Sequence, residues 1–223
     1  MQITAATLQF LRDLSDNNHR EWFQANKARY EAALENMKQF TKAVEQALGE
    51  TDVLEGSNLF RIYRDVRFSK DKAPYKNHFG VGFTRAIKRR RGGYYLHIEP
   101  GASFIGGGFW DPEAKDLKRI RDEFAADDRP IRQIIADARF QKYFGALEGD
   151  ELKTAPNGYD KAHPAVDLIR KKNFVVRRNF TDKEVTSPGF LQEVKLSFEA
   201  MRPYFDYMSE VLTTDLNGES LLD

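Results

Sequence analysis

The chain has 223 residues, 41% hydrophobic and 31% charged, a composition that suits one soluble globular domain and excludes a disordered chain. Lys and Arg number 35 against 34 Asp and Glu, which excludes a wholly polybasic binder. Without cysteine there are no disulfides, zinc–thiolate sites, iron–sulfur clusters or cysteine nucleophiles. Because we find neither a signal peptide pattern nor an apolar run of ~20 residues, we expect a cytoplasmic protein without membrane contact.

The first fifty residues have a helical pattern. An amphipathic stretch covers residues 4–14, and Asn18 with Glu21 forms a pattern like a capping box, which predicts that the next helix begins there. Gly49 is the predicted end of that helix. Three aromatic residues are predicted to belong to the core: Trp22, Tyr30 and Phe40.

Residues 57–110 predict a sheet. Apolar and polar residues alternate as in strands over 59–68, 79–84, 94–99 and 103–109. The connectors are short and contain glycine and proline, which favours hairpins and therefore an antiparallel sheet. Asp111 is then the predicted N-cap of a helix.

Residues 111–223 are predicted to be mainly helical. Helices are expected within 130–144 and 164–172, with a strand at 174–178. A final amphipathic helix covers 191–212, and Pro203 within it predicts a kink or a break at Arg202. Helices, then strands, then helices predict a single α+β domain over 1–223, with a mainly antiparallel central sheet flanked by terminal helices.

The segment from Arg61 to His78 carries the densest set of ionisable groups. If the start of this segment is a strand, Arg64 shares one face with apolar side chains. The neighbouring odd-numbered residues then lie on the other face. Arg64 would then bind a carboxylate or phosphate in a cleft, or form a structural ion pair with Asp65 or a distant acid. In the loop that follows, Asp71 can cap its own turn, and Tyr75 and His78 can each donate a proton.

A second polar row is predicted on the strand 94–99, where Tyr95, His97 and Glu99 share one face. If this row lies on the same side as Arg61 and the charged residues after it, an acid, a base and a cation would share one cleft. The alternative is a solvent-facing surface with cross-strand ion pairs. Sequence alone leaves both open.

Three consecutive glycines, 106–108, would weaken a strand, so their presence in one requires an explanation. They would form a bulge, or let a ligand or a second backbone approach closely. They match neither GxGxxG nor the P-loop pattern, and Trp110 beside them is predicted to fill the core.

A basic hairpin tip, residues 85–91, lies in a region of eleven Lys or Arg and two Asp between Leu59 and Gly93. Such a patch, with tyrosines interleaved, suits nucleic acid. The alternative is a solvated turn.

The spacing of the histidines does not predict a metal site. They fit neither HExxH nor HxH, and no GxSxG elbow or EF-hand loop is present. The four histidines are His19, His78, His97 and His163.

The run RIYRDVRFSKDKAPYKNH resembles the signature of a bacterial family, domain of unknown function 2461. Its elements are Arg, then Arg-Asp, then Arg-Phe, then Asp-Lys, then Tyr, and the later GYYLHIEP, GGGFWDP and KNFVVRR fit as well. The resemblance covers nearly the whole chain. It implies no activity and no catalytic residues to carry over.

The leading hypothesis is a binder of, or an enzyme acting on, a small anionic ligand that is phosphorylated or carboxylated. The alternatives are a nucleic-acid or protein-interaction module using hairpin 85–91, and a purely structural role for the charged segment. The residues identify no cofactor, no oligomeric state and no proof of catalysis. The predicted ligand-binding residues are Arg61, Arg64, Arg67, Asp71 and Lys72, and the catalytic candidates are Asp65, Tyr75 and His97.

Overall fold

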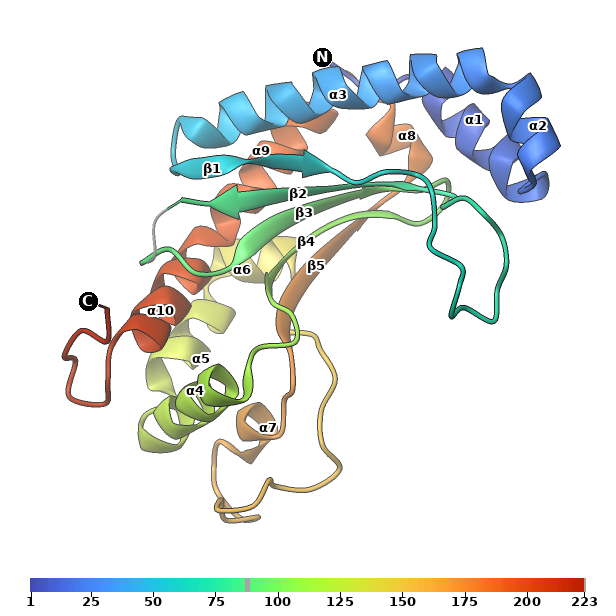
Figure 1. Ribbon diagram of the computed structural model, residues 1–223. Coiled ribbons are helices and arrows are strands. Elements are labelled where there is room, and N and C mark those ends of the chain that lie inside the picture. The colour runs from blue at the N-terminus through green and yellow to red at the C-terminus, as the bar shows by residue number, and fades with distance from the viewer. Residues whose placement is uncertain (87–88, 223) are drawn as a thin grey trace. The chain divides into compact units, whose positions relative to one another are not determined.

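The computed structural model describes residues 1–86 and 89–222, in which helices precede and follow a five-stranded sheet (Figure 1). The strands pair in the order β1-β2-β3-β4-β5 and are antiparallel, which confirms the predicted α+β class. The strands are β1 (Leu54–Leu59), β2 (Phe79–Arg85), β3 (Gly93–Ile98), β4 (Ser103–Phe109) and β5 (Phe174–Phe180). The helices are α1 (Ala5–Asp16), α2 (Arg20–Ala25), α3 (Lys27–Gly49), α4 (Ala114–Ala126), α5 (Arg129–Ala136), α6 (Ala138–Tyr143), α7 (Val166–Ile169), α8 (Asp182–Val185), α9 (Phe190–Ala200) and α10 (Arg202–Thr213). Within the described ranges, no helix is both long enough and apolar enough to cross a bilayer.

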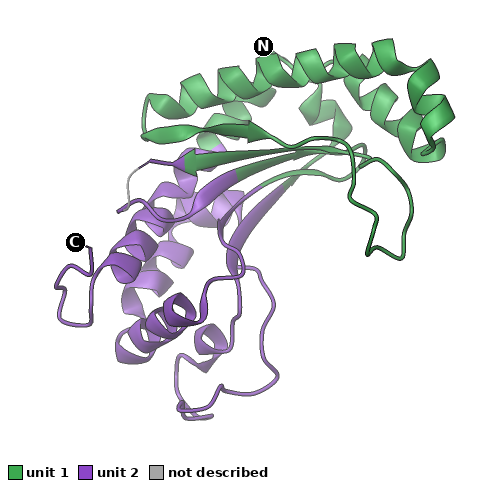
Figure 2. Cartoon of the chain, viewed as in Figure 1, with its two compact units in different colours: residues 1–84, 95–105, 179–196 green, residues 85–94, 106–178, 197–223 purple. Residues whose placement is uncertain are grey.

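The chain divides into two compact units (Figure 2). Each unit is assembled from three separate stretches of sequence, because strands β2 to β5 each contribute residues to both. Unit 1 comprises residues 1–84, 95–105 and 179–196, and unit 2 comprises residues 85–94, 106–178 and 197–223.

Helix α3 supplies much of the core of unit 1. Its buried residues Met37, Phe40 and Val44 recur at spacings of three and four and therefore face the same way. Phe40 stacks on Phe190 of α9, with ring centroids 5.5 Å apart. Helix α3 also packs along β1, and it ends at Gly49 as predicted.

The helix predicted to begin at Asn18 begins later and is divided in two. The N-cap of α2 is His19, whose ring nitrogen accepts a hydrogen bond from the Trp22 N–H. Glu21 lies beside that same ring, its Oε2 3.1 Å from His19 Nδ1. A break at Asn26 then separates α2 from α3.

The strand predicted over 59–68 is wrong. Strand β1 ends at Leu59, and residues 60–78 form a loop whose only ladder contact among the described residues is a bridge between Tyr63 and Tyr75. Phe68, whose side chain the predicted strand would place on the same apolar face as Arg64, is 96% exposed. The alternation of apolar and polar residues therefore imitates a strand that does not form.

Local hydrogen bonds explain why loop 60–78 turns instead of extending. The Asp65 carboxylate accepts a hydrogen bond from the Arg67 N–H, at 3.2 Å. Asp71 does the same with the N–H of Ala73, at 2.9 Å, so the predicted turn cap at Asp71 is confirmed. Side-chain acceptors that satisfy the backbone two residues later favour turns over strands.

The final helix of the chain is broken, as its sequence predicts. Helix α9 ends at Ala200 and α10 begins at Arg202. Pro203 lies in the first turn of α10, where a missing N–H costs no helical hydrogen bond. In unit 2 the buried Tyr204 donates a hydrogen bond to the Phe174 carbonyl of β5, at 2.8 Å.

The glycine run allows a second backbone to approach, which was one of the predicted reasons for it. A Cβ on Gly108 would lie 2.2 Å from the Phe174 carbonyl oxygen of the neighbouring strand. Trp110, predicted to fill the core, is instead 71% exposed. The helix start predicted at Asp111 is also wrong, because Asp111 has a positive φ of 47° and α4 begins at Ala114.

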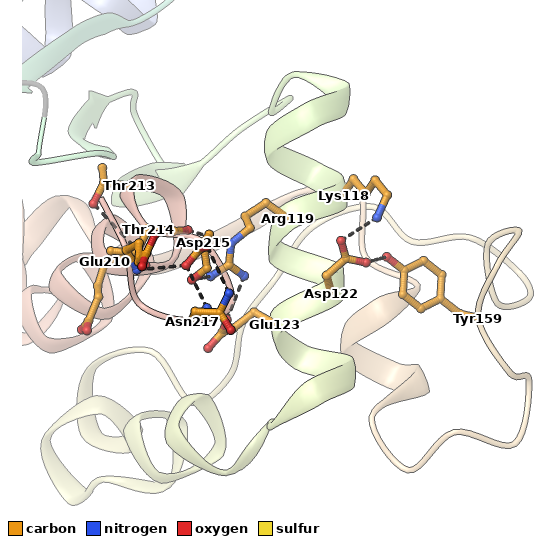
Figure 3. Close-up of polar contacts among 11 residues, drawn as sticks. Lys118, Arg119, Asp122, Glu123, Tyr159, Glu210, Thr213, Thr214, Asp215 and Asn217 are labelled. Atoms are coloured by element: carbon orange, nitrogen blue, oxygen red, sulfur yellow. Dashed lines mark hydrogen bonds and ion pairs between the residues drawn. The ribbon is translucent and has the colours of Figure 1, made fainter. Parts of the chain in front are cut away.

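Arg119 of α4 holds the chain that follows α10 (Figure 3). Its guanidinium donates hydrogen bonds to the carbonyls of Thr214 and Asp215, at 2.9 and 3.1 Å. A third hydrogen bond goes to the Glu123 carboxylate, at 2.8 Å. The cation thus satisfies the carbonyl of Thr214, the C-cap of α10, and that of the residue after it.

Candidate functional site

The polar row of Tyr95, His97 and Glu99 lies on one face of β3 and its continuation, as alternation predicts. The Tyr95 hydroxyl lies 3.2 Å from His97 Nδ1. His97 Nε2 lies 2.8 Å from the Glu99 carboxylate. Both ring nitrogens of His97 therefore have protein partners. His97 is also only 8% exposed, so the ring is largely shielded from water.

His78 joins this row from the end of loop 60–78. Its ring lies 4.1 Å from that of His97, measured between centroids. Strands β2 and β3 are antiparallel neighbours, so the residue that precedes β2 lies beside the end of β3. Burial, followed by the nearby His97, lowers the pKa of His78 to about 4, which leaves its imidazole neutral at physiological pH.

Two imidazoles and one carboxylate come together here as potential metal ligands. His78, His97 and Glu99 each offer one ligand atom, and these three atoms lie within 4.8 Å of one another. Nitrogen and oxygen ligands of this kind suit zinc and the other divalent transition metals. The sequence did not predict this set, because the two histidines come from different segments and meet only through the pairing of β2 with β3.

The residues around the three ligands hold them in place. Asn77 donates a hydrogen bond from its amide to Glu99 Oε1, at 2.6 Å, and its oxygen lies 3.2 Å from His78 Nδ1. The Phe104 ring of β4 stacks on the His97 ring at 4.6 Å. Metal ligands are commonly oriented by such outer hydrogen bonds and packing contacts.

Glycine at position 80 provides the space for the Tyr95 hydroxyl. A Cβ built on Gly80 would lie 2.6 Å from the Tyr95 hydroxyl oxygen, closer than real Cβ contacts come. Any other residue at position 80 would therefore displace the Tyr95 hydroxyl from its place beside His97.

The base of loop 60–78 is fixed just before Asn77 and His78. The Asn18 side chain hydrogen-bonds to both the carbonyl and the N–H of Tyr75, at 3.0 and 3.1 Å. The Tyr75 ring stacks on Phe23, with centroids 4.0 Å apart and planes at 11°. The catalytic candidate Tyr75 is thus 4% exposed and serves to anchor the loop in the core of unit 1.

A cavity of about 350 Å³ adjoins the ligand set, and we call it the α1 pocket. Glu99 and Asn77 line one part of it, and residues of α1 line another. Its lining residues are Leu11, Arg12, Ser15, Asp16, Asn77, Glu99 and Pro100.

The charged residues predicted to bind a ligand make their contacts within loop 60–78. Arg64 forms an ion pair, but its partner is Asp71 of the same loop and not Asp65 or a distant acid as predicted. Arg67 pairs with the catalytic candidate Asp65, with 2.6 Å between the charged atoms.

The remaining two predicted ligand-binding residues also lie outside the polar row. Arg61 is exposed, and the Lys72 ammonium donates a hydrogen bond to the Val66 carbonyl. Of the predicted site residues, His97 alone belongs to the row.

The ends of the basic hairpin 85–91 are tied to unit 2. The Arg85 side chain is 1% exposed and pairs with Asp206, at 2.6 Å. Arg91 pairs with Asp116. Residues 87 and 88 of the predicted nucleic-acid patch lie outside the described residues.

A family model described as "Conserved hypothetical protein (DUF2461)" matches residues 6–207. No curated protein and no solved structure matches the chain.

Proposed function

The chain belongs to the DUF2461 family of conserved hypothetical proteins, and we propose that it binds a divalent transition metal through His78, His97 and Glu99. Through this metal it would bind, or act on, a small anionic ligand. The observation that carries the proposal is the convergence of three ligand atoms within 4.8 Å on a supported strand pair.

The supports of the three side chains favour a metal over an accidental cluster. A metal ligand must be held in one orientation, and His97 is fixed by Tyr95 on one side and by the stacked Phe104 on the other. His78 is neutral at physiological pH, and the neutral imidazole is the form that coordinates a metal.

The charge of the loaded centre defines the ligand class. Two neutral imidazoles and one carboxylate leave one positive charge on a bound divalent ion. Three protein ligands also leave at least one coordination position open on a tetrahedral ion. A carboxylate or phosphate oxygen fits both the charge and the open position, which agrees with the anionic ligand expected from the sequence.

Metal titration of the chelator-treated full chain tests the proposal. We expect Zn²⁺, Co²⁺ or Mn²⁺ to raise the midpoint of thermal unfolding, with about 2.7 kcal/mol of stabilisation at one hundred times the Kd. The variants His78→Ala and Glu99→Gln should lose this effect.

The matched control is His19→Asn. His19 also lies beside a glutamate, at 3.1 Å from Glu21, but this pair is exposed and includes no second histidine. Asparagine at position 19 keeps an N-cap for α2. No stabilisation of the unmodified chain, or equal loss in the control, would refute the metal centre.

A further inference from the structure

The α1 pocket shares a wall with the proposed metal centre. Glu99 and Asn77 both line the pocket; one Glu99 oxygen accepts the Asn77 hydrogen bond, and the other lies 2.8 Å from His97 Nε2. A molecule in the pocket would therefore lie against Glu99, one of the three proposed metal ligands. The volume of about 350 Å³ lies at the lower end of the range for small-molecule sites, roughly 300–1,000 Å³.

Arg12 is the cation that lines the pocket. Its Nη2 donates to Asp182, at 2.5 Å, and its Nη1 makes a long contact of 3.4 Å with Gln9. A guanidinium has five N–H donors in a planar fork, so these two contacts leave donors for a further acceptor. Asp182 also accepts the Gly101 N–H, at 2.8 Å, which fixes the carboxylate that orients Arg12.

Two more polar groups of α1 line the same cavity. Ser15 and Asp16 lie three and four residues after Arg12, so all three share one helix face. The Arg12 guanidinium and the Ser15 hydroxyl can donate hydrogen bonds to an anionic group, and the Asp16 carboxylate can accept one from a hydroxyl or an amine elsewhere on the same ligand.

From this arrangement we infer that the substrate of the proposed metal centre is a small oxyanion with two anionic ends. One end would bind the metal, and the other, a carboxylate or a phosphate, would bind Arg12. The inference rests on the proposed metal centre, and it assigns Arg12 as the residue that selects for the second anionic group.

Cobalt-loaded full chain provides the test, because the visible absorption of Co²⁺ reports ligands that enter its coordination sphere. The three probes are glycolate, which has one carboxylate, malate, which adds a second carboxylate, and phosphoglycolate, which adds a phosphate. We expect at least one doubly anionic probe to bind about ten-fold more tightly than glycolate. Which one does so distinguishes a second carboxylate from a phosphate.

Arg12→Met should abolish this preference and leave the affinity for cobalt unchanged. Arg29→Met is the matched control, since both arginines have 45% exposed side chains and pair with an aspartate at 2.5 Å, but Arg29 does not line the α1 pocket. Equal affinity for all three probes, or a preference that survives Arg12→Met, would overturn the inference while cobalt binding stands. Failure to bind cobalt, zinc and manganese alike would overturn the metal centre, and this inference with it.

Discussion

At the scale of single residues, Gly80 offers a sharp test of how the polar row is positioned. A methyl group at position 80 would lie 2.6 Å from the Tyr95 hydroxyl oxygen, so the ring must move. We expect Gly80→Ala to lower the free energy of unfolding by about 1–3 kcal/mol, as overpacking commonly does. It should also weaken metal binding, because the displaced hydroxyl no longer orients His97. Urea unfolding and metal titration measure the two effects.

The same strand supplies the control. A Cβ on Gly82 would lie 3.5 Å from the Phe60 ring, an ordinary contact, so Gly82→Ala should stay within about 1 kcal/mol of the unmodified chain. In a Tyr95→Phe background, Gly80→Ala should cost less, because the clashing oxygen is gone. A full cost in that background would show that the strain does not involve the hydroxyl.

At the scale of elements, loop 60–78 is held in shape by internal ion pairs and positions His78. The signature arginines within it pair with aspartates of the same loop, Arg64 with Asp71 and Arg67 with Asp65. The distinctive charge pattern of the segment therefore serves at least to shape the loop. The loop in turn delivers Asn77 and His78 to the end of β3.

Fixing the base of the loop should matter more than its exposed charges. Asn18→Ala removes both hydrogen bonds to the Tyr75 backbone, so we expect a loss of about 1–3 kcal/mol of stability, together with weaker metal binding. Arg67→Ala should leave stability nearly unchanged, because the side chain is 76% exposed and its ion pair is screened by solvent. Urea unfolding of both variants measures the two losses of stability. Equal losses in the two variants would contradict the role of Asn18 in anchoring the loop.

The sequence predicts well those elements whose form depends on residues within the element itself. The strand 103–109 and the break between α9 and α10 match the structure, because alternation and proline act locally. Residues 60–68 belong to loop 60–78 and not to the predicted strand, since the periodicity does not register side-chain acceptors such as Asp65 that make a turn. The row of Tyr95, His97 and Glu99 follows from alternation on one strand.

The contribution of His78 could not be predicted in the same way. Its place beside His97 depends on the register between β2 and β3, which is tertiary information. The clue present in the sequence is a histidine directly before one strand of a predicted hairpin and a polar row at the end of the other.

At the scale of the whole molecule, the chain crosses between its two units several times, which sets how it can be divided. All proposed metal ligands lie within residues 1–105. Unit 1 nevertheless also requires residues 179–196. That stretch supplies Phe190, which is 1% exposed and stacks on Phe40 of α3. The metal ligands are therefore close together in sequence, whereas the core that supports them also includes residues from much later in the chain.

We expect a fragment of residues 1–105 to lack a cooperative unfolding transition and to bind metal no better than an unfolded chain. Without α9 the core face of α3 around Phe40 is uncovered, and burial of a large aromatic side chain contributes roughly 1.5–3 kcal/mol. Joining residues 179–196 to the fragment through a Gly/Ser linker should restore part of the cooperativity, monitored by circular dichroism during heating. A fragment 1–105 that unfolds cooperatively and binds metal like the full chain would show that α3 and the sheet residues suffice, and that α9 only covers a scaffold already formed.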